Sequence, residues 1–225
     1  MREQFRQELK AVHAEVVGIL DAVTESTRDG VTALISGDED LAMKVIGGDR
    51  DLDDRCAAVE ERVIETIATQ SPVARDLRLL QSLAYMAIRL ERMADLAVNI
   101  AKAAKRTAGR RGPQTLYDLI QAQGNLVYRV LDATREALDQ RDLELARKLP
   151  ELDEPIDHLY KQFFRELARL NNEEDIEWAS QMVLASRYLE RIADNSVDIG
   201  ERIAYLITGE RDLHAPETAP AEFSE

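Results

Sequence analysis

Several residue types are scarce in this chain of 225 residues, and each scarcity excludes a class of protein. The single cysteine, Cys56, excludes an intrachain disulfide and favours a reducing, cytoplasmic setting. No run approaches the roughly 18 consecutive apolar residues that a membrane-spanning helix needs. The N-terminal residues are charged and lack the apolar run of a signal peptide. We therefore expect contact with a membrane only through a partner.

Positive charge and catalytic motifs are scarce as well. The chain carries 43 acidic and 29 basic residues, a formal net charge of −14, so its surface repels the phosphate backbone of nucleic acids. No Gly-rich phosphate loop, nucleophile elbow or triad-like arrangement is found, and none of the three histidines has the Glu-x-x-His spacing of di-iron helical bundles. These absences argue against nucleic-acid binding and against an enzyme, and they favour metals or a basic protein as partners.

Apolar residues recur three and four positions apart along most of the chain, which places them on one face of an α-helix. The composition, 45% apolar and 32% charged, also favours long helices over a sheet. We predict six helices, with Asp38 as the N-cap of the second and with Ser71 and Pro72 as the N-cap and first residue of the third. Strand patterning is absent, so the predicted fold class is all-α. We expect Gly47-Gly48 to weaken or distort the second helix, and Pro150 and Pro155 to break or kink the fifth.

The chain contains an internal repeat. The segment Leu90–Asp95 (LERMAD) returns 99 residues later as Leu189–Asp194 (LERIAD), and the second helices of the two halves align at a shift of 104 residues. This similarity predicts two tandem, pseudo-repeated three-helix bundles. The expected boundaries are residues 1–108 and 114–208 for the two units, 109–113 for the linker and 209–225 for a disordered tail.

Each copy places acidic residues where apolar ones are expected. Glu91 and Glu190 lie on the apolar stripe of their helices, where a carboxylate is costly unless it is paired, protonated or bound to a metal. Residues four apart share one helix face, so acids at this spacing on two neighbouring helices would face each other. The candidate residues are Asp49, Asp53, Glu91 and Asp95 in the first copy and Asp153, Asp157, Glu190 and Asp194 in the second.

Several interpretations of these carboxylates remain open. Oxygen-only ligands suit hard cations such as Mg²⁺, Mn²⁺, Ca²⁺ or ferric iron, and bridging carboxylates would allow more than one ion per site. Internal salt bridges to Arg50, Arg92 or Arg191 would satisfy the same acids, and a lone acidic pair is usually a solvated face. The repetition of the motif favours metal binding. The alternatives to a metal-binding regulator are a metal-dependent phosphoester hydrolase and a purely structural helical interaction protein.

The doubled acidic motif, the tandem three-helix units and the segment Pro72–Arg78 (PVARDLR) resemble the PhoU family of bacterial phosphate-specific transport system accessory proteins. The resemblance covers about residues 1 to 207, although residues 171–177 lack a second Arg-Asp-Leu-Arg match. It implies a cytoplasmic, non-enzymatic negative regulator that connects the ATPase subunit of the phosphate ABC transporter to a sensor histidine kinase. It also implies a homodimer with multinuclear metal clusters at the acidic motifs, and it adds Asn99 and Asp198 to the candidate metal ligands.

Overall fold

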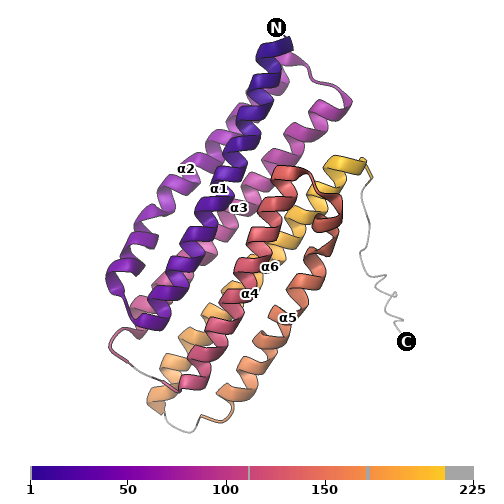
Figure 1. The fold of residues 1–225 in the computed structure, drawn as a ribbon. Helices are drawn as coiled ribbons and strands as arrows, with labels where there is room; N and C mark the ends of the chain where they lie inside the picture. The colour runs from indigo at the N-terminus through magenta and orange to yellow at the C-terminus, as the bar shows by residue number, and fades with distance from the viewer. Residues whose placement is uncertain (1, 111, 171–172, 211–225) are drawn as a thin grey trace, which may run out of the picture.

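The computed structural model describes residues 2–110, 112–170 and 173–210, and within these ranges it contains helices and no strands (Figure 1). The predicted all-α class is therefore confirmed. The expected disordered tail lies outside the described residues from position 211 onward. The helices are α1 (Arg2–Ser36), α2 (Glu39–Gln70), α3 (Ala74–Thr107), α4 (Gln114–Gln140), α5 (Leu143–Leu167) and α6 (Glu173–Thr208).

Aspartates begin the second helix of each copy. The carboxylate of Asp38 accepts a hydrogen bond from the backbone N–H of Leu41 at 2.9 Å, and that of Asp142 accepts one from Leu145 at 3.0 Å. Each carboxylate thus satisfies an N–H group that has no partner inside the first helical turn. The predicted N-cap at Asp38 is confirmed.

The predicted start of the third helix is wrong. Ser71 ends α2 in the left-handed conformation, with φ 47°, and its N–H donates to the carbonyl of Ile67 at 3.2 Å. Helix α3 begins only at Ala74, and its N-cap, Val73, makes no side-chain cap hydrogen bond. The residue before a proline is driven out of the right-handed helical region, so Pro72 stops α2 rather than opening α3.

Helices α2 and α5 run through the glycines and prolines expected to disturb them without ending there, so a break of α5 at its prolines is ruled out. Gly47 and Gly48 are exposed, and a Cβ atom on either would meet nothing within 4 Å. Pro150 and Pro155 are exposed as well. Pro150 removes the helical N–H partner of the Ala146 carbonyl, which lies against Gly200 of α6, and Pro155 removes that of the exposed Glu151.

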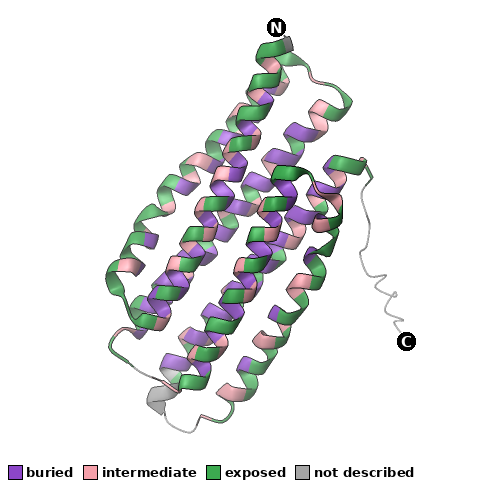
Figure 2. Cartoon of the chain, viewed as in Figure 1, coloured by how far each residue is buried: buried purple, intermediate pink, exposed green. Residues whose placement is uncertain are grey.

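The six helices form two three-helix bundles that pack side by side (Figure 1). Helix α1 packs on α4, and α3 packs on α6, whereas within the described residues α2 and α5 contact only helices of their own copy. Buried side chains follow the inward faces of all six helices and join into one core (Figure 2). No described helix has an apolar segment long enough to cross a bilayer.

Helices α5 and α6 approach each other closely at Gly200. A Cβ atom at this position would lie 2.5 Å from Cδ1 of Leu149 and 3.0 Å from the carbonyl oxygen of Ala146. Contacts this short exclude a side chain, so glycine allows α5 to lie directly against α6. This contact brings together the two helices that carry the acids of the second copy.

Candidate metal centres

The first acidic cluster lies along the seam between α2 and α3. Burial, followed by the charges of Asp53 and Asp95, raises the pKa of Asp49. Burial and the same two neighbours also raise the pKa of Glu91. Asp53 and Asp95 therefore lie close enough to Asp49 and Glu91 to disfavour the ionisation of those two carboxyl groups. The structure brings together all four acids predicted for the first copy.

Asp49 has no partner for one of its oxygens. Its Oδ1 atom is buried and has no hydrogen bond to any described residue. Lys102 is the only cation that lowers the pKa of Asp49, and its effect is smaller than those of burial and the two acids. An oxygen of this kind favours either a proton or a bound cation.

The second cluster has the same composition and lies between α5 and α6. Burial raises the pKa of Asp153 to about 7, with further contributions from Asp194, Asp157 and Glu190. Its Oδ1 atom is buried without a hydrogen-bond partner among the described residues, which repeats the arrangement at Asp49. Burial and the charge of Asp157 likewise raise the pKa of Asp194. The four acids predicted for the second copy are thus also together.

The second cluster differs from the first in holding a cation of its own. Arg187 forms an ion pair with Oε1 of Glu190, and the other carboxylate oxygen, Oε2, is buried and has no partner among the described residues. Glu190 is only 7% exposed, which makes it the most deeply buried of the eight predicted acids. At the position equivalent to Arg187 the first copy has Ile88, so its acids lack this neutralising charge.

The arginines expected to form salt bridges with the acids act on them only through their charge, as Arg92 does on Glu91 and Arg191 on Glu190. Arg50, Arg92 and Arg191 are exposed, and none forms an ion pair with a described residue. Arg187 was missed, although its position three residues before Glu190 on one helix would have identified it. Salt bridging therefore accounts for part of the second cluster and for none of the first.

The two ligands added by family resemblance lie at the edges of the clusters. Asp198 raises the pKa of Asp194, four residues earlier, but its Oδ2 atom also lies 2.8 Å from Nη1 of Arg89 on α3. Asn99 is half-buried on α3, four residues after Asp95. Asp198 therefore contacts both the second cluster and the first copy.

Within the described residues, no three His, Cys, Asp or Glu side chains converge as an ion-binding group in their present orientations. The donor set of each cluster is nevertheless entirely oxygen, which suits hard cations. His13 and His158 contact backbone carbonyls instead, and His214 lies outside the described residues. Cys56 is buried, and burial raises the pKa of its thiol to about 12, which keeps it protonated.

Comparison with known proteins gives a consistent result for the whole chain. A family model described as "PhoU domain" matches residues 16–104 and again residues 120–203. A "phosphate-specific transport system accessory protein PhoU homolog" of Clostridium acetobutylicum is 32% identical over 93% of this chain and 97% of its own length. The "phosphate-specific transport system accessory protein PhoU" of Escherichia coli is 28% identical over 94% of this chain and 88% of its own length.

Solved structures agree in fold with this chain. The crystal structure of PhoU from Pseudomonas aeruginosa superposes with a TM-score of 0.87 at 28% identity, covering 92% of this chain and all of that one. The phosphate transport system regulatory protein PhoU from Streptococcus pneumoniae superposes with a TM-score of 0.83, also at 28% identity, and covers 92% of this chain and 98% of its own. The similarity therefore extends over both copies and their packing.

Proposed function

Because this chain belongs to the PhoU family, we propose that it is a regulatory accessory protein of phosphate transport rather than an enzyme. Its relatives are named as accessory proteins of the phosphate-specific transport system, and the match covers nearly their full length. In the finer form of the proposal, the protein acts in the cytoplasm. It connects the ATPase subunit of the phosphate transporter to a sensor histidine kinase and keeps the phosphate-starvation response off.

The outer helices offer surfaces suited to protein partners or to a second copy of the chain. Met43 and Ile64 on α2 and Phe164 on α5 are exposed apolar side chains. Within the described residues, α2 contacts only helices of the first three-helix bundle and α5 contacts only helices of the second. The other bundle of the same chain therefore covers neither outward face. Exposed apolar side chains among charged ones are typical of protein interfaces.

Metal binding at the two acidic seams is the second part of the proposal. The observation that supports it most strongly is the duplication of a carboxylate oxygen, at Asp49 and Asp153, that is buried without a partner among the described residues. A hard cation would supply the positive charge that these oxygens lack and would hold each outer helix against its neighbour. Ligation requires the carboxylates to turn toward a common point. The proposed ligands are Asp49, Asp53, Glu91, Asp95 and Asn99 in the first copy and Asp153, Asp157, Glu190, Asp194 and Asp198 in the second.

Elemental analysis and thermal melts test the metal sites. Protein purified without chelator should contain a hard divalent or trivalent metal, and chelation should lower its melting temperature. Binding to the folded state alone contributes about 2.7 kcal/mol when free metal is a hundredfold above its Kd. The double variant Glu190→Gln/Asp194→Asn should lose the metal of the second site, and without metal it should be at least as stable as the wild type.

A matched control removes two acids at the same spacing elsewhere. Glu61 and Glu65 are exposed on α2 and four residues apart, so Glu61→Gln/Glu65→Gln should leave metal content unchanged. If the melting temperature of the wild type changes with neither metal nor chelator, the proposal of metal sites is refuted. This outcome would leave the regulatory role standing.

Gene expression tests the regulatory role. In a strain without any second copy of the gene, deletion should raise expression of phosphate-responsive genes in phosphate-rich medium, and the wild-type gene should restore repression. Copurification with the transporter ATPase subunit and the kinase tests the adaptor role. Unchanged repression after deletion contradicts the proposal, and phosphatase activity of the metal-loaded protein would favour the hydrolase alternative.

A further inference from the structure

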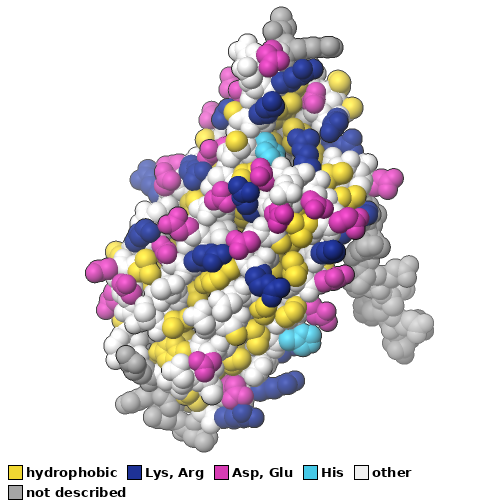
Figure 3. Space-filling view, viewed as in Figure 1, with side chains coloured by type: hydrophobic (Ala, Val, Ile, Leu, Met, Phe, Trp, Pro, Cys, Tyr) yellow, Lys and Arg dark blue, Asp and Glu magenta, His cyan; other side chains and the backbone are white. Residues whose placement is uncertain are grey.

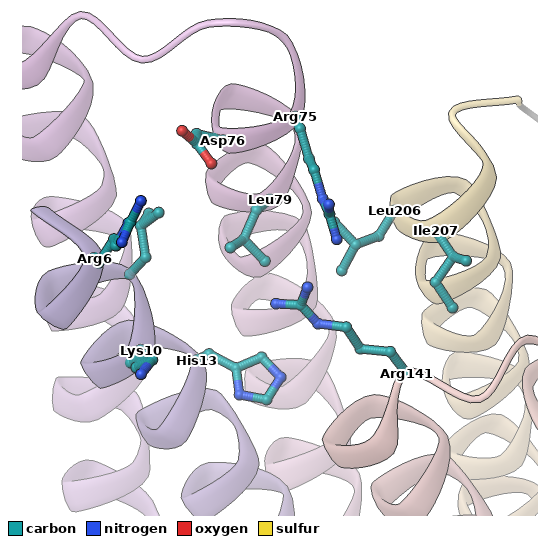
Figure 4. Close-up of a pocket in the computed structure, with 10 residues that line it drawn as sticks. Arg6, Lys10, His13, Arg75, Asp76, Leu79, Arg141, Leu206 and Ile207 are labelled. Carbon is teal, nitrogen blue, oxygen red and sulfur yellow. The ribbon is translucent and has the colours of Figure 1, made fainter. Parts of the chain in front are cut away.

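A basic pocket opens where the two copies meet at the N-terminal end of α1. It has a volume of about 590 Å³ and is bordered by α1, the first turns of α3, the loop after α4 and the last turns of α6 (Figure 4). The space-filling view shows Lys and Arg side chains gathered beside a histidine toward this end of the molecule (Figure 3). A pocket lined by basic side chains is unusual in a chain whose net charge is −14.

Four cationic side chains line this pocket, and none is neutralised. Arg6 and Lys10 come from α1, Arg75 from the start of α3 and Arg141 from the residue after α4. All four are exposed, and none forms an ion pair or a side-chain hydrogen bond with a described residue. Among the described lining residues, Asp76 is the only acid.

The two arginines come from different copies and point into the same space. Figure 4 shows the guanidinium groups of Arg75 and Arg141 facing each other across the pocket. Arg141 is the C-cap of α4 and has the left-handed conformation, with φ 55°. Two cations that face each other without a carboxylate between them repel, and a bound anion would remove that repulsion.

The pocket also has a polar ring and an apolar wall. The Nε2 atom of His13 lies 3.2 Å from the carbonyl oxygen of Leu138, so Nε2 is the donor and Nδ1 is left for a ligand. Leu9, Leu79 and Leu206 are buried side chains that form the apolar wall. A site of this composition suits a molecule with one strongly anionic end and one flat or apolar end.

We propose that this pocket binds a phosphorylated organic molecule of nucleotide size, with its phosphate groups on Arg75, Arg141, Arg6 and Lys10. Small-molecule sites typically have volumes of about 300–1,000 Å³, and an inorganic phosphate ion would leave most of this pocket empty. Arginine pairs and lysine are the usual donors to phosphate oxygens.

Such a ligand would fasten the two copies together. Its phosphate groups would contact α1 and α3 of the first copy and Arg141 of the second, while Leu206 belongs to α6. Binding would therefore favour the arrangement in which the copies are in contact at this end. The concentration of a phosphorylated metabolite would then influence the fraction of molecules whose two bundles are in contact at this end.

Calorimetric titration of the full chain with ATP, AMP, inorganic phosphate and adenosine tests the proposal. All titrations contain chelator, so that no ligand binds through a metal at the acidic seams. ATP and AMP should bind more tightly than inorganic phosphate or adenosine. The variant Arg75→Gln/Arg141→Gln should weaken ATP binding at least about tenfold, because it removes charge-assisted hydrogen bonds.

Two comparisons separate this site from a general effect of charge. The variant Arg129→Gln/Lys161→Gln removes two exposed cations outside the pocket and should bind ATP as the wild type does. Asp76→Asn removes the pocket's carboxylate and should tighten binding. If Arg75→Gln/Arg141→Gln fails to fold by circular dichroism, Arg6→Gln/Lys10→Gln replaces it.

Equal ATP affinity in the pocket variant and the control would overturn the proposal, as would the absence of binding by any probe. If inorganic phosphate binds as tightly as AMP, the inference that the ligand carries an organic group is wrong. If adenosine binds as tightly as AMP, the inference that the pocket recognises the phosphate group is wrong. None of these outcomes depends on whether the acidic seams hold metal.

Discussion

Arg89 on α3 forms an ion pair with Asp198 on α6, with 2.8 Å between Nη1 and Oδ2. The same guanidinium donates to the side-chain oxygen of Asn195 at 3.3 Å and to the hydroxyl of Tyr85 at 2.8 Å. This network joins the two copies across their interface. Since Asp198 also lies one helical turn after Asp194, it connects the second acidic cluster to the other copy.

Replacing Arg89 with methionine should destabilise the protein by about 1–3 kcal/mol, because hydrogen-bonded charges are left without their partner. Burial and the nearby charge of Asp198 already raise the pKa of Glu201, and Arg89 opposes that effect. Urea unfolding of Arg89→Met, Asp198→Asn and the double variant measures the coupling. Additive changes in the free energy of unfolding would show that the ion pair contributes nothing.

Asp153 should make stability depend on pH when metal is absent. Its pKa rises from an ordinary value of 3.8 to about 7 on folding, so the folded state holds the proton more tightly than the unfolded state. Its contribution to stability is therefore complete below the unfolded pKa and is lost as pH rises through about 7. In chelator, Asp153→Asn should raise stability at pH 8 by on the order of 1–3 kcal/mol and flatten the pH profile.

Melting temperatures from about pH 4 to about pH 8 check this expectation. Glu151→Gln is the control, because Glu151 is an exposed acid on the same helix. A profile for Asp153→Asn as steep as that of the control would contradict the prediction.

Arg187 should have opposite effects on metal binding and on stability. Its replacement by isoleucine, the residue of the first copy, removes a cation from the second cluster and should tighten metal binding there roughly tenfold. In chelator the same variant should be less stable by about 1–3 kcal/mol, because the buried Glu190 carboxylate loses its ion pair. Calorimetric metal titration and melts measure both quantities. The reciprocal change, Ile88→Arg, should weaken metal binding at the first site.

Glycine-to-alanine changes should act in opposite directions at two places. At Gly47 or Gly48 a methyl group meets nothing within 4 Å, so alanine should stabilise the helix by about 0.5–1 kcal/mol. At Gly200 the methyl group would lie 2.5 Å from Leu149, so alanine should destabilise by about 1–3 kcal/mol. Chemical denaturation measures both changes, and a stabilising Gly200→Ala would disprove the close approach of α5 and α6.

The sequence predicts the parts of this structure that depend on local spacing. The recurrence of LERMAD as LERIAD placed Glu91 and Glu190 at equivalent positions, and the structure surrounds each with the predicted acids. The end of α2 was harder to predict, because a serine can cap either end of a helix. Here the proline that follows Ser71 determines that the residue ends α2.

Features assembled from distant segments could not be predicted in this way. The basic pocket combines Arg6, Arg75 and Arg141, which are near one another only after both copies have folded and packed. The ion pair of Arg89 with Asp198 depends on the same packing. Periodicity identifies which face of a helix is buried, but it does not state which two faces meet.

The outer position of α2 and α5 has a consequence for local unfolding. Because each contacts only its own copy within the described residues, either helix can open while the four inner helices stay associated. Amide hydrogen exchange should therefore be faster in α2 and α5 than in α3 and α6. Among the outer helices, occupancy of one acidic seam would slow exchange mainly in the helix that carries its ligands, α2 for the first seam and α5 for the second.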